Sequence, residues 1–365
     1  MRDISIPVMR PRLPAAERLL PYLRRIDAAR WYSNFGPLAQ ELEARLTAHW
    51  HVPGGGVLTL SNATQGLTVA LMAAGAAPGT LCLMPAWTFV ATAHAAVQAR
   101  MVPYLVDVDP AGGALTPGLA EAALAAAPGQ VGAIMPVCPF GAPVDWSAWA
   151  ELQRRTGIPV VIDAAAAFDS VRPGPVPSVV SLHATKALGA GEGGVLLCTD
   201  TDLVARARAC SNFGFLGSHV SHRVATNAKM SEYHAAVALA ALDGWPETRA
   251  NWTHSLCLVR EAVQAGLSRA DWPAGLIGSY ICSSPTIQVE DAAAVAATLR
   301  EDGIEARKWW QDGIPSHPAF AHCPATPLPV TAALAHATLA LPCWQDMDDD
   351  VAGRLHRSLA RHGRR

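Results

Sequence analysis

Residues 56 to 200 alternate short apolar runs with longer stretches of helical character, and this alternation limits the fold more than any other feature of the chain. Runs that are apolar throughout are typical of strands buried on both faces, and helices of about ten or more residues between them favour parallel pairing. The alternation predicts the α/β class, with a mostly parallel sheet between helices. The predicted strands are GVLTL, LCLM, VPYLVDV, VGAIMPV, PVVID, VVSL and GGVLLC.

The chain beyond about Trp245 follows a different pattern. We expect a long helix after DGWPETRANW, then two strand candidates, SYIC and PTIQV, then a helix over DAAAVAATLREDG and a last helix after DMDDD. Strands and helices in this order are typical of an α+β unit. We therefore predict a large domain over residues 1–245, which includes the N-terminal segment, and a smaller C-terminal α+β domain over residues 246–365.

The charge balance argues against one class of partner. The chain has 365 residues, 16% of them charged, and a net charge of −2. A dedicated nucleic-acid-binding protein normally carries a concentrated basic face, which this balance does not favour. The basic end, RLHRSLARHGRR, is interpreted as a solvated C-terminal helix in preference to a polyanion-binding segment.

The start of the chain and its cysteines bear on where the protein works. The segment MRDISIPVMRPRLPAAERLL has neither a long apolar core nor a small-residue cleavage site, so it does not resemble a signal peptide. No apolar stretch reaches the roughly 18 residues that a membrane span needs. The eight cysteines are scattered and form no CxxC pair, which favours buried free thiols over a disulfide framework or a zinc site. We expect a cytoplasmic protein without a metal.

Polar residues follow several of the predicted strands. In parallel sheets of this kind, ligands bind beyond the carboxyl ends of the strands, so these residues are expected to converge at one edge. The segments that carry them contain Ser61, Asn62, Ala63 and Thr64 after LTL, Trp87 and Thr88 after LCLM, Asp163 at the end of VVID, and Ser181, His183 and Lys186 at and after VVSL.

Lys186 lies in the stretch SLHATKALGAGEGG, where the glycines follow the lysine. In the phosphate-binding P-loop the glycines come first, and Ser or Thr directly follows the lysine. Here Ala187 follows Lys186, so the nucleotide-binding interpretation is disfavoured. A lysine can instead be a covalent catalyst that forms a Schiff base, as with pyridoxal 5′-phosphate (PLP).

PLP requires four groups from a protein. These are the lysine, a carboxylate at the pyridine nitrogen, a flat side chain against the ring, and hydroxyl or N–H groups on the phosphate, best supplied at a helix N-terminus. Lys186, Asp163, Trp87 and the helix start at 62–64 could supply them. Each also has a simpler interpretation: a strand end for Asp163, core packing for Trp87, an N-cap for the helix start and a structural role for His183. Together, and in this order, they predict a PLP site.

Segments along nearly the whole chain are similar, in the same order, to those of a known family. SNATQGLTVALMAAG is similar to an N-G-T-D-A-L phosphate helix, and MPAWTFVATA to P-[SA]-[FWY]-T-F-V-A-T-A. IPVVIDAAAAFDS is similar to E-D-A-A-Q-A, SLHATK to S-F-H-x-T-K, and TNAKMSEYHAA to Y-N-Y-R-M-[DS]-E-L-Q-A-A. The chain thus resembles the PLP-dependent nucleotide-sugar aminotransferases of the DegT/DnrJ/StrS type, which have the fold type I architecture.

The resemblance implies a role for each matched residue. Lys186 would hold PLP and then move the proton between the two reacting carbons, and Asp163 would pair with the ring nitrogen. Trp87 would stack on the ring, and His183 matches a histidine beside the cofactor. The phosphate would be bound by the helix start, through Asn62, Ala63 and Thr64, and by Ser181.

The resemblance also implies partners. Asn227 matches an asparagine that reaches the phosphate of the neighbouring subunit, so each site would require a homodimer. The amino donor would be an amino acid, with L-glutamate favoured, and the acceptor a keto group on a sugar nucleotide. The GEGG that follows Lys186 resembles members that act on 4-keto-6-deoxyhexoses, and this favours that acceptor.

Some positions depart from the family pattern. Ala166 replaces the glutamine of E-D-A-A-Q, and Ile162 replaces its glutamate. The substrate loop reads WWQDGIPSHPAF, so Trp309 and Trp310 occupy the usual His-Tyr positions, and Pro315 replaces a usual histidine. Gln65 replaces the acidic residue of the phosphate helix. These changes leave the cofactor set intact and lie where the acceptor would be recognised.

Two alternatives stay open at this point. A PLP enzyme with another keto acceptor, such as a cyclitol or a non-sugar ketone, is compatible with the altered substrate loop. A PLP-binding regulatory protein without turnover is compatible with the fold, because fold alone does not establish function. Family relatives that dehydrate sugars carry histidine where this chain has Lys186, so they are disfavoured.

Overall fold

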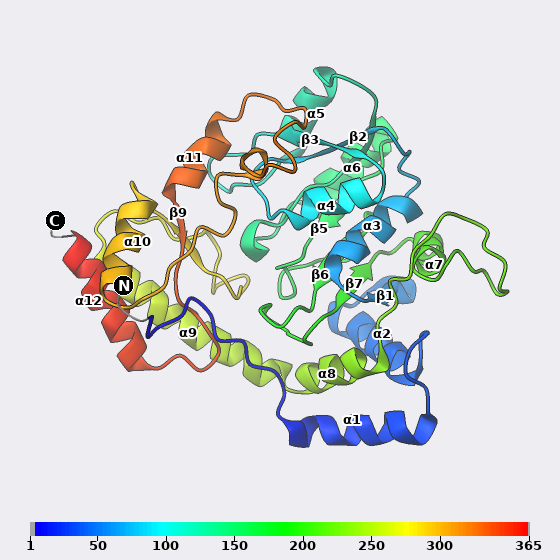
Figure 1. Ribbon diagram of the computed structural model, residues 1–365, viewed down its shortest axis with the longest axis horizontal. Helices are drawn as coiled ribbons and strands as arrows, with labels where there is room; N and C mark the ends of the chain where they lie inside the picture. Colours follow the sequence, from blue (N-terminus) through cyan, green and yellow to red (C-terminus); the bar gives the residue numbers. More distant parts are fainter. Residues whose placement is uncertain (1–3, 364–365) are drawn as a thin grey trace.

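The computed structural model describes residues 4–363, and its largest element is a sheet with helices on both faces (Figure 1). A four-stranded part, in the order β1-β7-β6-β5, and a three-stranded part, in the order β3-β2-β4, make up this sheet. Parallel bridges join Ile134 to Val160 and Val137 to Asp163, so β4 lies beside β5. The strands are β1 (Val57–Leu60), β2 (Leu81–Pro85), β3 (Val102–Val106), β4 (Val131–Ile134), β5 (Ile162–Asp163), β6 (Ser178–Ser181) and β7 (Gly194–Leu197).

The strand directions confirm the mostly parallel sheet. β2 pairs in parallel with β3 and β4, and β5 pairs in parallel with β6. Only β7, among the strands of this sheet in the described chain, runs antiparallel, to both β1 and β6. The loop 182–193 joins β6 to β7 without a crossover helix, and this direct return explains the antiparallel direction.

Both faces of the sheet are buried, which explains why its strands are apolar throughout. In β2, Leu83 packs into the core that includes Leu152 of α6, while its neighbours Cys82 and Met84 pack into the opposite core with Leu67 of α3. Full burial of one such side chain contributes about 1.5–3 kcal/mol. The helices of this part are α1 (Ala16–Ala29), α2 (Pro37–Trp50), α3 (Ala63–Ala73), α4 (Ala91–Gln98), α5 (Pro117–Ala125), α6 (Trp146–Thr156), α7 (Thr201–Cys210), α8 (Glu232–Asp243) and α9 (Trp245–Gly266).

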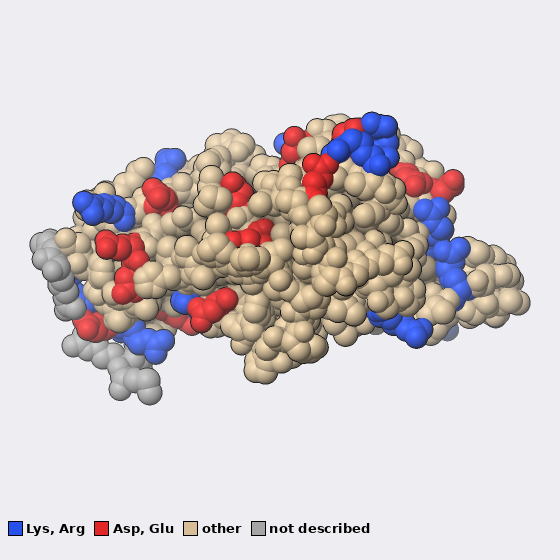
Figure 2. All heavy atoms as spheres, turned by 90° about the horizontal axis from the view of Figure 1, so that it is seen from above, with Lys and Arg blue, Asp and Glu red and all other residues tan. Residues whose placement is uncertain are grey.

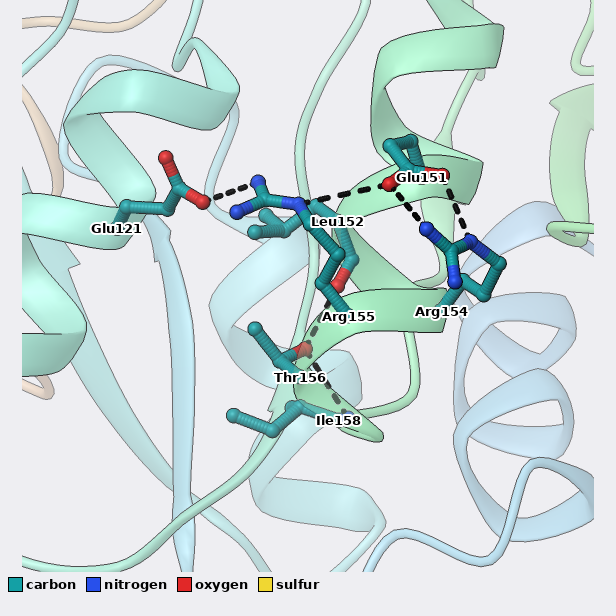
Figure 3. A network of polar contacts seen from close by, with 7 residues as sticks. All are labelled: Glu121, Glu151, Leu152, Arg154, Arg155, Thr156 and Ile158. Atoms are coloured by element: carbon teal, nitrogen blue, oxygen red, sulfur yellow. Dashed lines mark hydrogen bonds and ion pairs between the residues drawn. The ribbon is translucent and has the colours of Figure 1, made fainter.

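Helix α6 illustrates how the sequence sets helix ends. Asp145 caps its N-terminus by accepting a hydrogen bond from Ala148 N at 3.0 Å, and Gly157 ends it with φ +69°. Near its C-terminus, Arg154 pairs with Glu151, and Arg155 pairs with Glu121 of α5 (Figure 3). Because these ion pairs are exposed to solvent and salt, they contribute little to the stability of the fold.

The chain after α9 forms a smaller group of elements. They are β8 (Thr286–Gln288), α10 (Ala292–Glu301), α11 (Pro329–Ala337), β9 (Thr338–Ala340) and α12 (Asp349–Gly363), with β8 and β9 antiparallel. The expected strand at PTIQV and the expected helices α10 and α12 are confirmed. α12 packs along α9, and Leu355 and Leu359 are buried on its inner face. Residues 364–365 of the basic end lie outside the described residues.

The predicted strand at SYIC is wrong. Ser279 N and Tyr280 N both bond to Gly275 O, at 2.8 and 3.3 Å, so the chain turns there. Tyr280, Ile281 and Cys282 are apolar because they are buried in this turn, which a short apolar run alone cannot distinguish from a strand. The predicted boundary between the two domains at residue 245 stays a prediction. Helix α9 begins at Trp245. Ile6, near the N-terminus, pairs with Ile304 in the C-terminal part of the chain.

Other features concern the surface and possible metal sites. All eight cysteines lie within residues 4–363, and none forms a disulfide there. Over the same range, no group of His, Cys, Asp or Glu is arranged to hold a metal ion, and no helix is long and apolar enough to cross a membrane. On the face shown in Figure 2, Lys and Arg lie in separate groups interspersed with Asp and Glu.

Candidate active site

Lys186 lies in the loop between β6 and β7, which folds back on itself. Lys186 N bonds to His183 O at 2.9 Å, and Ala184 N bonds to Gly191 O at 2.8 Å. The Lys186 side chain is partly buried, and no hydrogen bond to its Nζ is found within residues 4–363. Loss of solvent lowers the pKa of Lys186, although the charge of Asp163 opposes this shift. A lowered pKa leaves more of the amine neutral and nucleophilic.

Asp163 is the last residue of β5 and is 5% exposed. Its Oδ2 accepts a hydrogen bond from Thr92 Oγ1 at 2.8 Å, and its Oδ1 accepts one from Ala165 N at 3.1 Å. Burial raises the pKa of Asp163, while these two bonds and the charge of Lys186 lower it. A buried carboxylate held in this way suits a cationic partner.

The N-terminus of α3 could bind an anion. Asn62 caps the helix by accepting a bond from Gln65 N at 2.9 Å. No partner is found in the described chain for the N–H groups of Ala63 and Thr64, which lie in the first turn. Such groups, with the helix dipole, favour a phosphate.

Gly194 brings a second element to this helix start. It pairs with Ser181 across β6 and β7, and a Cβ at Gly194 would lie 2.8 Å from Ala63 N. The absence of a side chain therefore lets β7 approach the helix closely. Asn62, Ala63, Thr64 and Ser181, which the sequence predicts as phosphate-binding residues, are brought together around Gly194.

Trp87 follows β2 and belongs to an aromatic wall. It is 3% exposed, and its ring meets that of Trp310 edge to face at 5.2 Å. Trp310 also stacks on Phe140, with centroids 4.0 Å apart. The loop that carries Trp310 is fixed to the sheet edge by a 2.9 Å bond from Ile314 N to Ala86 O. One substituted position of the substrate loop thus contacts the predicted ring-stacking residue directly.

His183 and Asn227 are more exposed. His183 Nδ1 lies 2.8 Å from Thr185 Oγ1, and its Nε2 lies 3.7 Å from Glu192 Oε1. Asn227 Oδ1 accepts a bond from Lys229 Nζ at 2.7 Å. The segment that carries Asn227 lies beside the end of β1, since Ser61 N bonds to Ala228 O at 2.7 Å.

Sequence analysis placed Thr88 at the sheet edge without a role, and it missed Thr92 and one aromatic residue of the site. Thr88 and Thr92 lie in the quoted segment MPAWTFVATA, but no role was predicted for them; their four-residue spacing beside Trp87 is the signal that could have identified them. Phe140 gives no such signal, because it reaches the site only through a left-handed backbone, with φ +50°, after β4.

The arrangement meets the four requirements of PLP. It contains an amine of lowered pKa, a buried carboxylate, unpaired N–H groups at a helix start and a buried flat ring. The residues present therefore fit this cofactor, which would be held by Lys186, Asp163, Trp87 and the start of α3.

Comparison with known proteins agrees with this chemistry. The model of the DegT/DnrJ/EryC1/StrS aminotransferase family matches residues 15–360. Protein Rv3402c of Mycobacterium tuberculosis is 32% identical over 369 residues, which cover 95% of this chain and 88% of that protein.

Two further similarities carry functional names. The dTDP-4-amino-4,6-dideoxy-D-glucose transaminase of Shigella dysenteriae is 33% identical over 243 residues, which cover 65% of this chain and 64% of that protein. The crystal structure of DesI in the presence of its TDP-sugar product superposes with a TM-score of 0.87 and 31% identity. That match covers 100% of this chain and 95% of DesI.

Proposed function

The chain belongs to the DegT/DnrJ/EryC1/StrS aminotransferase family, and on this basis we propose that it moves an amino group from L-glutamate to the keto carbon of a 4-keto-6-deoxyhexose nucleotide. The family is one of PLP-dependent sugar aminotransferases with the fold type I architecture, and PLP is the cofactor. One observation carries the proposal. Asp163 is buried at the end of β5, and the partly buried Lys186 lies in the loop that follows the neighbouring strand β6, where the charge of each side chain affects the pKa of the other.

The proposed roles follow from the positions of the side chains. PLP, when bound, supplies an electron sink that stabilises negative charge on the reacting carbon. Lys186 would hold the cofactor through Nζ and, once its amine is released, Nζ would take the proton from the amino-bearing carbon of the donor and pass it on. Asp163 holds a proton at the ring nitrogen. Trp87 covers the ring and excludes water.

The phosphate group would be held by the residues around Gly194. The N–H groups of Ala63 and Thr64 and the hydroxyl of Ser181 act as donors, while the side chain of Asn62 keeps the helix start in place. His183 lies in the loop that carries Lys186, and we assign it a supporting position beside the cofactor.

A homodimer would complete the site, with Asn227 reaching the phosphate of the neighbouring subunit. The exposed position of Asn227 and the apolar loop before it support this proposal. Several exposed apolar side chains on one loop favour a protein interface. The exposed apolar residues of the loop are Phe213, Leu216, Val220 and Val224, with exposures of 47%, 50%, 60% and 74%.

The acceptor is proposed from two similar proteins, a dTDP-4-amino-4,6-dideoxy-D-glucose transaminase and DesI, whose structure was determined in the presence of its TDP-sugar product. Ala166, Trp309 and Trp310 differ from the family pattern, and they lie where the acceptor would be recognised. Aromatic side chains pack well against the apolar surface of a sugar ring. Trp309 and Trp310 are therefore compatible with a deoxysugar that presents few hydroxyl groups to them.

A direct assay tests this acceptor. The protein, loaded with PLP and supplied with L-glutamate, is incubated with dTDP-4-keto-6-deoxyglucose, and the amino sugar nucleotide is measured by mass spectrometry together with 2-oxoglutarate. We expect both products in equal amounts. A keto-cyclitol and a non-sugar ketone are run in parallel, and turnover of either, without turnover of the sugar nucleotide, would overturn the proposed acceptor.

A further inference from the structure

Three buried side chains form a chain of hydrogen bonds that ends on Asp163. Thr88, just after β2, is 1% exposed, Thr92 in the first turn of α4 is 0% exposed, and Asp163 is 5% exposed. The hydroxyl oxygens of Thr88 and Thr92 lie 2.9 Å apart, and Thr92 Oγ1 lies 2.8 Å from Asp163 Oδ2. Three separate segments therefore meet at one carboxylate.

Proton counting fixes the direction of these bonds. A threonine hydroxyl has one proton to donate. When Asp163 is ionised it only accepts, so Thr92 gives its proton to Oδ2 and cannot also donate to Thr88. Thr88 is then the donor in the 2.9 Å contact with Thr92. A neutral Asp163 could instead donate to Thr92, and the direction of the chain would reverse.

We infer that Thr92 and Thr88 are positioning residues that act in series, fixing the orientation of the Asp163 carboxylate and holding it ionised for the ring nitrogen of the cofactor. This inference rests on the proposed function, because it assigns Asp163 to that nitrogen. Ala165 N fixes the other carboxylate oxygen at 3.1 Å, so both oxygens are held from the protein side. Charge-assisted bonds of this kind are stronger than those between neutral groups.

The other titratable groups around Asp163 do not replace this pair. Lys186 lowers the pKa of Asp163 through its charge, but its amine is engaged when the cofactor is held. Cys138 is a buried thiol whose pKa is raised well above its usual value, so it carries no charge near neutral pH. Thr92 is therefore the side-chain donor that remains for Asp163 in the loaded enzyme, within the described residues.

The test is the state of the ring nitrogen, read by NMR in the holoenzyme loaded with [15N]PLP. In wild type we expect the 15N signal of a protonated pyridine. In Thr92→Val the carboxylate becomes a stronger base, so the shared proton moves towards Asp163 and the signal moves towards that of an unprotonated ring. The dissociation constant of PLP should rise about fivefold, the usual effect of one hydrogen bond.

Matched variants separate positioning from packing. Thr92→Ser keeps the hydroxyl and should restore the wild-type signal. Thr88→Val should give a smaller change in the same direction, and the double variant should match Thr92→Val alone, because the bonds act in series. If Thr92→Val does not fold, Thr88→Val decides the question.

Two outcomes distinguish the inference from the proposed function. A wild-type 15N signal in both Thr92→Val and Thr88→Val would overturn the inference, with the cofactor assignment intact. A wild-type protein that takes up no PLP would overturn the proposed function itself.

Discussion

A Cβ at Gly194 would lie 2.5 Å from the carbonyl carbon and oxygen of Asn62. Real Cβ atoms essentially never approach backbone atoms so closely, so any side chain at this position must move either β7 or the start of α3. Strand β7, which follows the loop of Lys186, can therefore approach the start of α3, which would hold the phosphate, only because residue 194 is glycine.

Gly194→Ala tests this requirement. The substitution should displace the N–H groups of Ala63 and Thr64 and raise the dissociation constant of PLP by about tenfold or more, because helix-start donors must lie within hydrogen-bond distance. PLP titration followed by absorbance measures the effect. Gly118→Ala on α5 is the control, since nothing lies within 4 Å of its added Cβ, and it should leave PLP affinity unchanged. Equal affinity in both variants would remove Gly194 from the site.

Lys186→Ala should abolish the covalent bond between protein and cofactor. Intact-mass spectrometry after borohydride reduction should show the mass of PLP added to wild type and none added to the variant. An unchanged adduct on Lys186→Ala would place the covalent site on another lysine and would remove the central residue of the proposal.

Asp163→Asn should keep PLP but lose most turnover, because an unprotonated ring is a poor electron sink. A fully active variant would contradict the role of Asp163.

The same substitution also has a pH signature in the cofactor-free protein. Burial raises the pKa of Asp163 above 3.8, so its neutral form stabilises the fold fully below that value. That stability is lost as pH rises through the native pKa, whereas the asparagine side chain of the variant does not titrate. The free energy of unfolding of the variant, relative to wild type, should increase as the pH rises above about 4. If the difference in unfolding free energy between variant and wild type does not change with pH, burial does not raise the pKa of Asp163.

Asn227→Ala should weaken PLP retention in the proposed homodimer. If Asn227 serves the neighbouring site, a mixed dimer of Asn227→Ala and Lys186→Ala chains contains one complete site. Random mixing of the two variants should then give about a quarter of wild-type activity from the half of the dimers that contain one complete site, in addition to what the Asn227→Ala homodimers retain. No recovery in dimers shown to have exchanged subunits would indicate that Asn227 acts within its own chain.

The large sheet could be predicted from the sequence because strands that are buried on both faces are apolar at every position. It gave no indication that β7 would be antiparallel, since strand direction depends on where the loop after Lys186 returns. The polar residues at strand ends were identified because parallel strands bring their carboxyl ends to one edge.

Contacts between distant segments could not be predicted in the same way. Glu232, which is buried, accepts hydrogen bonds from Leu38 N at 2.7 Å and Ala39 N at 2.9 Å, and so caps α2 from a segment 194 and 193 residues away. The contact of Thr92 with Asp163 spans 71 residues. Such pairs have no periodicity, and one sequence does not show which partner a polar side chain will meet.

The measurement that tests the central claim most directly is the absorption spectrum of the purified, PLP-loaded protein before and after addition of L-glutamate. We predict a visible band of lysine-bound cofactor that disappears as the band of pyridoxamine phosphate grows, with release of 2-oxoglutarate. This result would establish the cofactor, the lysine linkage and the donor together. A cofactor band that glutamate leaves unchanged would contradict glutamate as the donor. The absence of any cofactor band after addition of PLP would contradict the account built on Lys186.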